Sequence, residues 1–147
     1  AESNSKRLGL IEQSHSGDTA VFGAARHGEL QVLLTLVELG ARIDCRNDKD
    51  QTPLMLAARQ GQADVVKELI RRQADVRAVD AKTRSSSLMQ AARFGHAETV
   101  ALLLTHVPEE DIDAGDKHGY TALMRAAGQG HVQVTIELLK RMCNIAT

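Results

Sequence analysis

The sequence has few aromatic residues, few cysteines and no long apolar run. Only 2% of the residues are aromatic, and tryptophan is absent. Enzyme pockets and base-stacking surfaces commonly rely on such rings, so the composition argues against a free-standing enzyme and against binding of single-stranded nucleic acid. No stretch approaches the roughly 20 apolar residues of a membrane span, and the first residues lack the apolar centre of a secretion signal.

The charges are nearly balanced, since 18 Lys and Arg residues stand against 19 Asp and Glu residues. A net charge of −1 gives no general attraction for nucleic acid or anionic lipid, so we expect no nucleic acid partner and no membrane insertion. Cys45 and Cys143 are too few for a disulfide framework, and we expect two thiols in an intracellular compartment, the cytoplasm or alternatively the nucleus. The chain lacks an initial Met, so we expect either a processed protein or, as the favoured alternative, an excised piece of a longer one.

One short phrase recurs four times along the chain: two alanines, two variable residues and a glycine. The glycines, Gly28, Gly61, Gly95 and Gly130, lie 33, 34 and 35 residues apart. A period near 33 residues with small insertions is typical of stacked helical repeats.

Each copy has the features of two short helices. Thr19, Thr52 and Thr121 stand where a helix would start, and threonine is a good N-cap. The recurrent glycine suits a left-handed C-cap. A second helix follows, as at residues 63–72, and polar residues such as 46–51 predict a hairpin-like loop between copies. One helix pair cannot bury its apolar side alone, so neighbouring pairs must stack.

These residues resemble the ankyrin repeat family. Residues 51–58 read Gln-Thr-Pro-Leu-Met-Leu-Ala-Ala, close to the family's Thr-Pro-Leu-His-x-Ala-Ala, and residues 116–124 carry a related phrase. The Leu-Met wording is similar to long ankyrin arrays of some protists, some of which are attached to kinases. The resemblance implies an all-α solenoid of helix-turn-helix units joined by β-hairpin-like loops. We predict a flank or cap at residues 1–13 and one repeat domain at 14–147, with repeats at about 14–46, 47–79, 80–115 and 116–147.

The copies depart from the family pattern in three ways. Met55, Met89 and Met124, and Phe22 in copy one, replace the family's histidine, and we expect soft apolar packing between repeats at these positions. Copy three is irregular near residues 85–88 and 107–110, which predicts the most mobile loops. The flanks also carry apolar residues. Before the repeats, Leu8, Leu10 and Ile11 predict a cover for the first end of the stack. At the other end, a helix expected at 131–142 keeps apolar residues that predict either more repeats or another domain after it: Val132, Val134, Ile136, Leu138 and Leu139.

Motifs for catalysis, metal or phosphate binding are missing from the sequence. His96 and His131, which each follow a recurrent glycine, suit structural hydrogen bonds at the start of the second helix, since no second ligand lies at zinc-like spacing. Cys45 has no histidine partner nearby in the sequence, and the acidic residues 109–113 lack the alternation of a calcium loop. We therefore expect no catalytic residue, no metal and no cofactor.

The resemblance implies that a partner would bind the concave groove and the hairpin tips. By position, the tip of a first hairpin would comprise His15, Ser16 and Asp18. The predicted partner-binding residues are Arg26, His27, Asp48, Lys49, Gln51, Arg59, Gln60, Lys82, Arg84, Arg93, Phe94, Lys117, His118, Tyr120 and Gln129.

Arg26, Arg59 and Arg93 occupy the same place in three copies and predict a groove for an acidic or phosphorylated segment, with Phe94 and Tyr120 as apolar anchors. The alternative is that each arginine pairs with a nearby aspartate, such as Asp18, Asp50 or Asp80. We predict a monomeric protein–protein interaction module rather than an enzyme. A regulatory or targeting segment of a larger enzyme, for example a kinase, is the second hypothesis, and a free-standing enzyme with a hidden cleft is the third.

Overall fold

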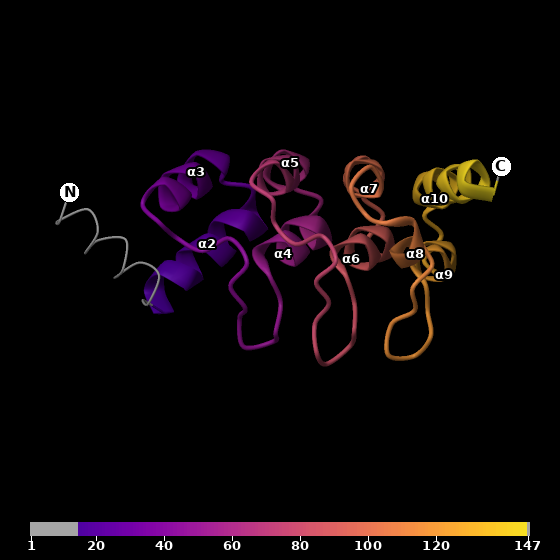
Figure 1. The fold of residues 1–147 in the computed structure, drawn as a ribbon, viewed down its shortest axis with the longest axis horizontal. Coiled ribbons are helices and arrows are strands. Elements are labelled where there is room, and N and C mark those ends of the chain that lie inside the picture. Colours follow the sequence, from indigo (N-terminus) through magenta and orange to yellow (C-terminus); the bar gives the residue numbers. More distant parts are fainter. Residues whose placement is uncertain (1–14, 147) are drawn as a thin grey trace.

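A computed structural model describes residues 15–146 of the chain, and in that range the chain folds into four successive helix pairs (Figure 1). The described residues contain no strand, only an isolated bridge between Val79 and Ser86. The pairs are α2 (His15–His27) with α3 (Leu30–Glu38), α4 (Pro53–Gln60) with α5 (Ala63–Arg71), α6 (Ser87–Arg93) with α7 (Ala97–Leu104), and α9 (Ala122–Gly128) with α10 (Val132–Ala146); a single turn, α8 (Glu109–Ile112), precedes the last pair.

The helices form two rows that run along the length of the molecule (Figure 1). The first helices α2, α4, α6 and α9 pack successively against one another in the inner row, and α3, α5, α7 and α10 follow the same order in the outer row. Loops between pairs project from the inner row on one side (Figure 1). The predicted all-α solenoid with hairpin-like loops is confirmed.

Hydroxyl side chains start the last three inner helices. Thr52 accepts a hydrogen bond from the backbone N–H of Met55 at 3.3 Å, and Ser86 and Thr121 accept the corresponding bond in their copies. The prediction was wrong for Thr19, because α2 already begins at His15, four residues earlier. Copies two to four have Asn or Asp five or six residues before the cap, which closes a hairpin turn, and copy one lacks it.

The same early start of α2 corrects another expectation. His15, Ser16 and Asp18 lie within the first turns of α2 and not at the tip of a hairpin. The candidate partner surface therefore has three hairpins within the described residues rather than four.

Each recurrent glycine has the left-handed backbone that the sequence predicted. The φ angles of Gly28, Gly61, Gly95 and Gly130 are +72°, +71°, +80° and +76°. A side chain at such a position would strain the backbone, so glycine ends the inner helix and turns the chain toward the outer one.

The core lies between the two rows and between successive pairs. Ala57 and Ala58 are fully buried and let neighbouring inner helices approach closely, while Leu69 and Leu103 fill the space between rows. The alanines and leucines of neighbouring copies merge into one continuous core.

The predicted packing of the methionines holds for two of three. Met55 and Met89 are 1% and 4% exposed, but Met124 is 54% exposed, because no inner helix after α9 packs over it within residues 15–146.

Two details of the second half of the chain differ from expectation. The acidic stretch near 109–113 forms the turn α8, anchored by the buried Ile112 and by an ion pair between Arg77 and Asp111 at 2.7 Å. The last helix runs to Ala146 rather than to Met142. The predicted cap at residues 1–13 lies outside the described residues.

The two histidines after recurrent glycines are structural, as predicted. The Nε2 atom of His96 lies 2.8 Å from the backbone carbonyl of Arg59, and the Nε2 atom of His131 lies 2.8 Å from that of Arg93. Each ring therefore joins its own helix pair to the pair before it.

Candidate partner-binding groove

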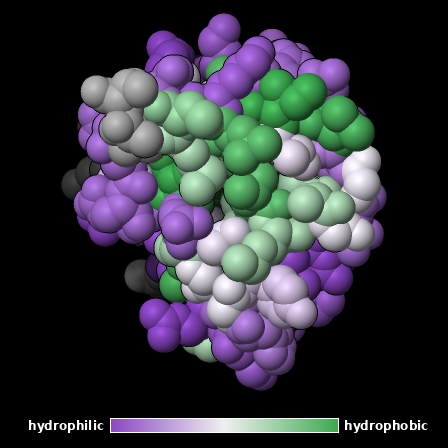
Figure 2. All heavy atoms as spheres, turned by 90° about the vertical axis from the view of Figure 1, so that its right-hand side faces the viewer, coloured by the Kyte–Doolittle hydropathy of each residue, from purple (hydrophilic) through white to green (hydrophobic). Residues whose placement is uncertain are grey.

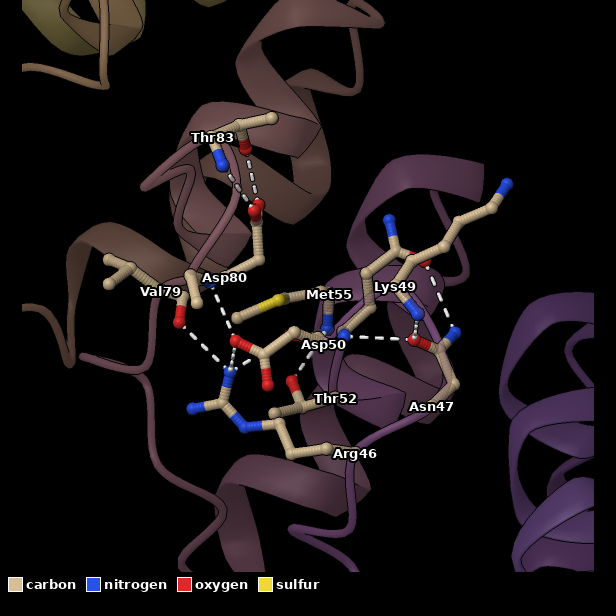
Figure 3. Close-up of polar contacts among 11 residues, drawn as sticks. Arg46, Asn47, Lys49, Asp50, Thr52, Met55, Val79, Asp80 and Thr83 are labelled. Carbon is tan, nitrogen blue, oxygen red and sulfur yellow. Dashed lines mark hydrogen bonds and ion pairs between the residues drawn. The ribbon is translucent and has the colours of Figure 1, made fainter.

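Neighbouring hairpins are bonded to one another along one edge of the stack (Figure 3). The guanidinium of Arg46 donates to the carbonyl of Val79 at 2.9 Å and pairs with Asp50 at 3.4 Å. The Asp50 carboxylate in turn accepts from the backbone N–H of Ala81 at 2.6 Å. These bonds fix the hairpin of the second pair against that of the third.

The hairpin of the third pair is bonded in turn to that of the fourth pair. The backbone N–H of Lys117 donates to the carbonyl of Thr83 at 2.8 Å. Within the hairpin of the third pair, both the N–H and the hydroxyl of Thr83 donate to the buried carboxylate of Asp80. The hairpins thus form a continuous edge that holds its side chains in fixed places.

Two hollows lie between this edge and the inner helices. The first, of about 500 Å³, lies between α2, α4 and the hairpin at residues 47–51, and the second, of about 570 Å³, lies between α4, α6 and the following hairpins. Lys49, Gln51 and Arg59 line both hollows, so the two hollows form one groove.

Ten of the predicted partner-binding residues line this groove. Those in the first hollow are Arg26, His27, Asp48, Lys49, Gln51, Arg59 and Gln60; the second adds Lys82, Arg93 and His118. The structure therefore brings together most of the positions chosen by their place in the repeat.

Five predicted residues do not line the two hollows. Arg84 lines a separate hollow of about 200 Å³ beside Arg77 and Asp111. Lys117, Gln129, Phe94 and Tyr120 are exposed outside the hollows, and the two aromatic rings lie beneath arginines.

The ring of Phe94 supports two guanidinium groups at the edge of the groove. The Cζ atoms of Arg59 and Arg93 lie 4.9 and 5.4 Å from its centroid, within the range of a cation–π interaction. Arg125 lies over the ring of Tyr120 in the same manner, at 4.5 Å. The rings therefore position cations as well as offering apolar surface.

The alternative in which the arginine row pairs with aspartates is not what the structure shows. Within residues 15–146, Arg26, Arg59 and Arg93 form no ion pair, while Asp50 pairs with Arg46. The carboxylate of Asp80 is bonded within its own hairpin.

Three carboxylates line the groove, those of Asp48, Asp80 and Asp116, and Asp116, like Asp80, is already bonded. Burial raises its pKa, but hydrogen bonds from the Arg125 guanidinium and from the backbone N–H groups of His118 and Tyr120 outweigh burial and lower the pKa below its usual value. Asp116 is thus ionised and paired with Arg125. Lys49, Arg59, Lys82 and Arg93 then outnumber Asp80, the remaining carboxylate of the second hollow, so this hollow has an excess of positive charge.

Sequence reasoning missed one set of lining residues that follows the repeat. Gly23, Leu56, Gln90 and Arg125 all lie five residues before a recurrent glycine, and all line the groove. They are one helical turn before the predicted arginine row, on the same side of the inner helix. The spacing of the repeat alone would have identified them.

The described residues offer no metal site, since no three His, Cys, Asp or Glu side chains gather there to hold an ion. None of the helices between residues 15 and 146 combines the length and the apolar character that crossing a bilayer requires.

Comparison with known proteins links residues 4–147 to one family. A family model described as "Ankyrin repeats (3 copies)" matches residues 4–80 and 74–147. The chain is 40% identical over 86 residues to the rice protein named probable E3 ubiquitin-protein ligase XBOS31, which covers 58% of the chain and 19% of that protein. It is 33% identical over 98 residues to human ankyrin repeat domain-containing protein 63, covering 65% of the chain and 26% of that protein.

A fungal relative matches over more of the chain. The Neurospora crassa ankyrin repeat protein nuc-2 is 31% identical over 136 residues, which are 92% of this chain and 12% of nuc-2. The chain spans about a quarter or less of the length of these curated relatives.

Proposed function

The chain belongs to the ankyrin repeat family, whose members are protein–protein interaction modules, and we propose that it binds an acidic or phosphorylated segment of a partner protein along the groove of α2, α4, α6 and their hairpins. In this proposal the module acts as an intracellular monomer and catalyses no reaction itself. The single observation that carries the proposal is the excess of positive charge in the second hollow of the groove.

That charge comes from four side chains that reach the groove from two neighbouring pairs and their hairpins. Lys49, Arg59, Lys82 and Arg93 line the second hollow, and none forms an ion pair within residues 15–146. A hydrogen bond to a charged group contributes about 1.5–3 kcal/mol, so two or three such bonds support specific binding. A carboxylate or phosphate is the group that these cations would select.

The spacing of the inner helices suits an extended ligand. Packed helices lie roughly 8–10 Å apart, and an extended chain advances about 3.3 Å per residue. An acidic or phosphorylated side chain at every third residue would therefore meet successive arginines of the row formed by Arg26, Arg59 and Arg93.

The test is a double charge reversal, Arg59→Glu with Arg93→Glu. Partners captured from a cell lysate by the unchanged chain are identified by mass spectrometry, and the affinity of each for both proteins is measured by calorimetry. We expect at least about a 100-fold loss of affinity, because two charged hydrogen bonds are replaced by repulsion.

A matched control carries the same change of net charge on the outer row. Lys67→Glu with Lys140→Glu alters exposed residues of α5 and α10 away from the groove, and we expect binding to persist. Equal binding by the groove variant and the unchanged chain would contradict the proposal. Phosphatase treatment of the lysate separates a phosphorylated ligand, whose capture is lost, from an acidic one, whose capture remains.

A second candidate function is that of a regulatory or targeting segment of a larger enzyme, such as an ankyrin-bearing protein kinase. The observation that favours it is that the chain matches only 19% and 18% of two plant relatives whose names describe them as E3 ubiquitin-protein ligases. The test places the groove variant in the whole parent protein. If the second candidate is right, we expect the parent enzyme to lose its selectivity for substrates or its cellular location, while its basal rate of catalysis stays unchanged.

A further inference from the structure

The junction of the second and third pairs contains an arginine that its counterpart one repeat later lacks. At this junction the guanidinium of Arg46 donates to the Val79 carbonyl at 2.9 Å and pairs with Asp50 at 3.4 Å (Figure 3). Val79 has the repeat position of Arg46, since each directly precedes the residue that opens its hairpin, Asp80 or Asn47. The side chain of Val79 has no polar group, so it cannot bond the fourth pair as Arg46 bonds the third.

The anion of the earlier junction is also replaced, in this case by a cation. Arg84 has the repeat position of Asp50, two residues before the helix cap, and both have a left-handed backbone, with φ angles of +57° and +61°. Such a backbone is uncommon for residues other than Gly, Asn and Asp. Among residues 15–146, Arg84 forms no ion pair. The junction of the third and fourth pairs thus has a single guanidinium where the earlier one has a closed ion pair.

A hollow of about 200 Å³ lies at this junction, between the hairpin of the third pair and the segment that joins α7 to α9. Its apolar lining consists of Val76, Val79, Met89, Val107 and Ala114. Sites for whole small molecules usually measure about 300–1,000 Å³. The size of this hollow therefore suits a single apolar residue of a larger ligand.

The charges around the hollow leave one cation in excess. Both oxygens of Asp111 accept from Arg77, at 2.7 and 3.4 Å, so these two charges offset each other. Arg84 is the third charged residue of the lining. The hollow therefore favours a negatively charged group, and a carboxylate matches the planar guanidinium.

This hollow is separate from the groove. Along the hairpin of the third pair, Thr83 and Ser85 line the groove, whereas Arg84 and Ser86 line the hollow, so alternate residues serve different sides. Met89 alone lines both the hollow and the second part of the groove. The hollow is likewise separate from the end of the stack formed by α9 and α10, where Figure 2 shows hydrophobic residues gathered at the surface.

We propose that this hollow binds the carboxyl terminus of a partner polypeptide that ends in a branched apolar residue. The terminal carboxylate pairs with Arg84 and restores the pair of opposite charges that the earlier junction forms within the chain. The apolar side chain, attached to the same carbon, lies against Val79 and Val107. An Asp or Glu side chain supplies the charge without an apolar branch beside it. Val79 is 39% exposed, so the rest of the partner chain can leave the hollow toward solvent.

The test is a titration of the 15N-labelled chain with three acetylated hexapeptides that share a glycine-serine body. One ends in leucine with a free carboxylate, one ends in leucine amide, and one ends in glycine with a free carboxylate. The backbone N–H signals of Arg84 and Gly115 report on the hollow. We expect saturation by the leucine acid with a Kd below about 1 mM. The other two peptides should bind at least about tenfold more weakly, because one lacks the charge and the other lacks the buried side chain.

Two variants of Arg84 separate its charge from its role in the fold. Gly119 has the same repeat position in the fourth pair with φ +81°, so glycine suits this backbone. Arg84→Gly should therefore keep the melting temperature within about 3 °C and lower the affinity for the leucine acid at least about tenfold. Arg84→Lys keeps the positive charge without the planar fork and should lose less affinity than Arg84→Gly.

The groove variant serves as the matched control. Arg59→Glu with Arg93→Glu leaves the lining of the hollow unchanged, and the leucine acid should bind it as it binds the unchanged chain. Failure of the groove to bind its own ligand would leave this result unaffected, so the inference and the proposed function can fail separately.

Three results would overturn the proposal. These are equal affinity for the leucine acid and its amide, unchanged affinity of Arg84→Gly, and loss of binding in the groove variant, which would place the peptide in the groove. Binding of N-acetylleucine as tight as that of the hexapeptide would instead assign the hollow to small carboxylates rather than to the end of a partner chain.

Discussion

Corresponding repeat positions in the interior of the stack and at its C-terminal end hold similar residue types, but they are buried to very different extents. Leu104 in α7 and Leu139 in α10 occupy the same position of the repeat, yet they are 4% and 45% exposed. The difference lies in the neighbour, since the last pair covers α7 while no described pair covers α10. A repeat position therefore has no fixed energy of its own, and its contribution depends on the pair that follows.

The largest expected effect comes from truncating the same repeat position to alanine in the interior of the stack and at its C-terminal end. Leu104→Ala should lower the free energy of unfolding by about 2–5 kcal/mol, because it opens a cavity in a packed junction. Leu139→Ala should cost less than about 1 kcal/mol, since much of its side chain already contacts water. Urea denaturation followed by circular dichroism measures both, and similar losses would contradict neighbour-dependent burial.

The glycines give a second, smaller contrast. Gly61→Ala meets a strained left-handed backbone, which costs about 1–3 kcal/mol, and also displaces the His96 ring from its hydrogen bond, worth about 1 kcal/mol. Gly130→Ala meets the backbone strain alone, because nothing lies near its Cβ. The first variant should be less stable than the second by about 1 kcal/mol in the same assay, and the reverse order would show that the junction histidine adds no restraint.

The smallest effect concerns the last hairpin and its dependence on pH. The folded pKa of Asp116 lies below the unfolded value of about 3.9, so its contribution to stability is complete above that pH and is lost as the pH falls through the folded pKa. Asp116→Asn makes this hairpin resemble that of Asn47, which keeps the backbone hydrogen bonds. At pH 7 the free energy of unfolding of the variant should be lower by about 1 kcal/mol. Between pH 5 and pH 2.5 its stability should fall less than that of the unchanged chain, as measured by denaturation across that range. An unchanged dependence of stability on acid pH would exclude Asp116 as a source of that dependence.

Local rules of the chain made most of the fold predictable. The recurrent glycines, the capping residues Thr52 and Thr121, and the two alanines before each glycine depend only on backbone geometry and on close helix contact, and the structure has them as expected. The prediction that Thr19 caps a helix was wrong, because a cap also needs a turn before it and copy one lacks the Asn or Asp that forms this turn.

The remaining features depend on neighbours that are distant in the sequence. The exposure of Met124 depends on whether another pair follows, and the bonds of Asp50 to Arg46 and Ala81 depend on how two hairpins meet. The placing of Arg93 and Arg59 on one ring is likewise a contact between two repeats. Periodicity located ten of the residues that line the groove, but it could not tell which of their charges were already bonded.

The bonds between the hairpins bear on how tightly the groove can hold a ligand. Flexible loops lose motion when a ligand orders them, and that loss is subtracted from the affinity. Here the carbonyl of Val79, the N–H of Ala81 and the carbonyl of Thr83 are already held by their neighbours. The loops are therefore ordered as the chain folds. When a segment binds, the conformational entropy that is lost is mainly that of the segment itself as it becomes extended.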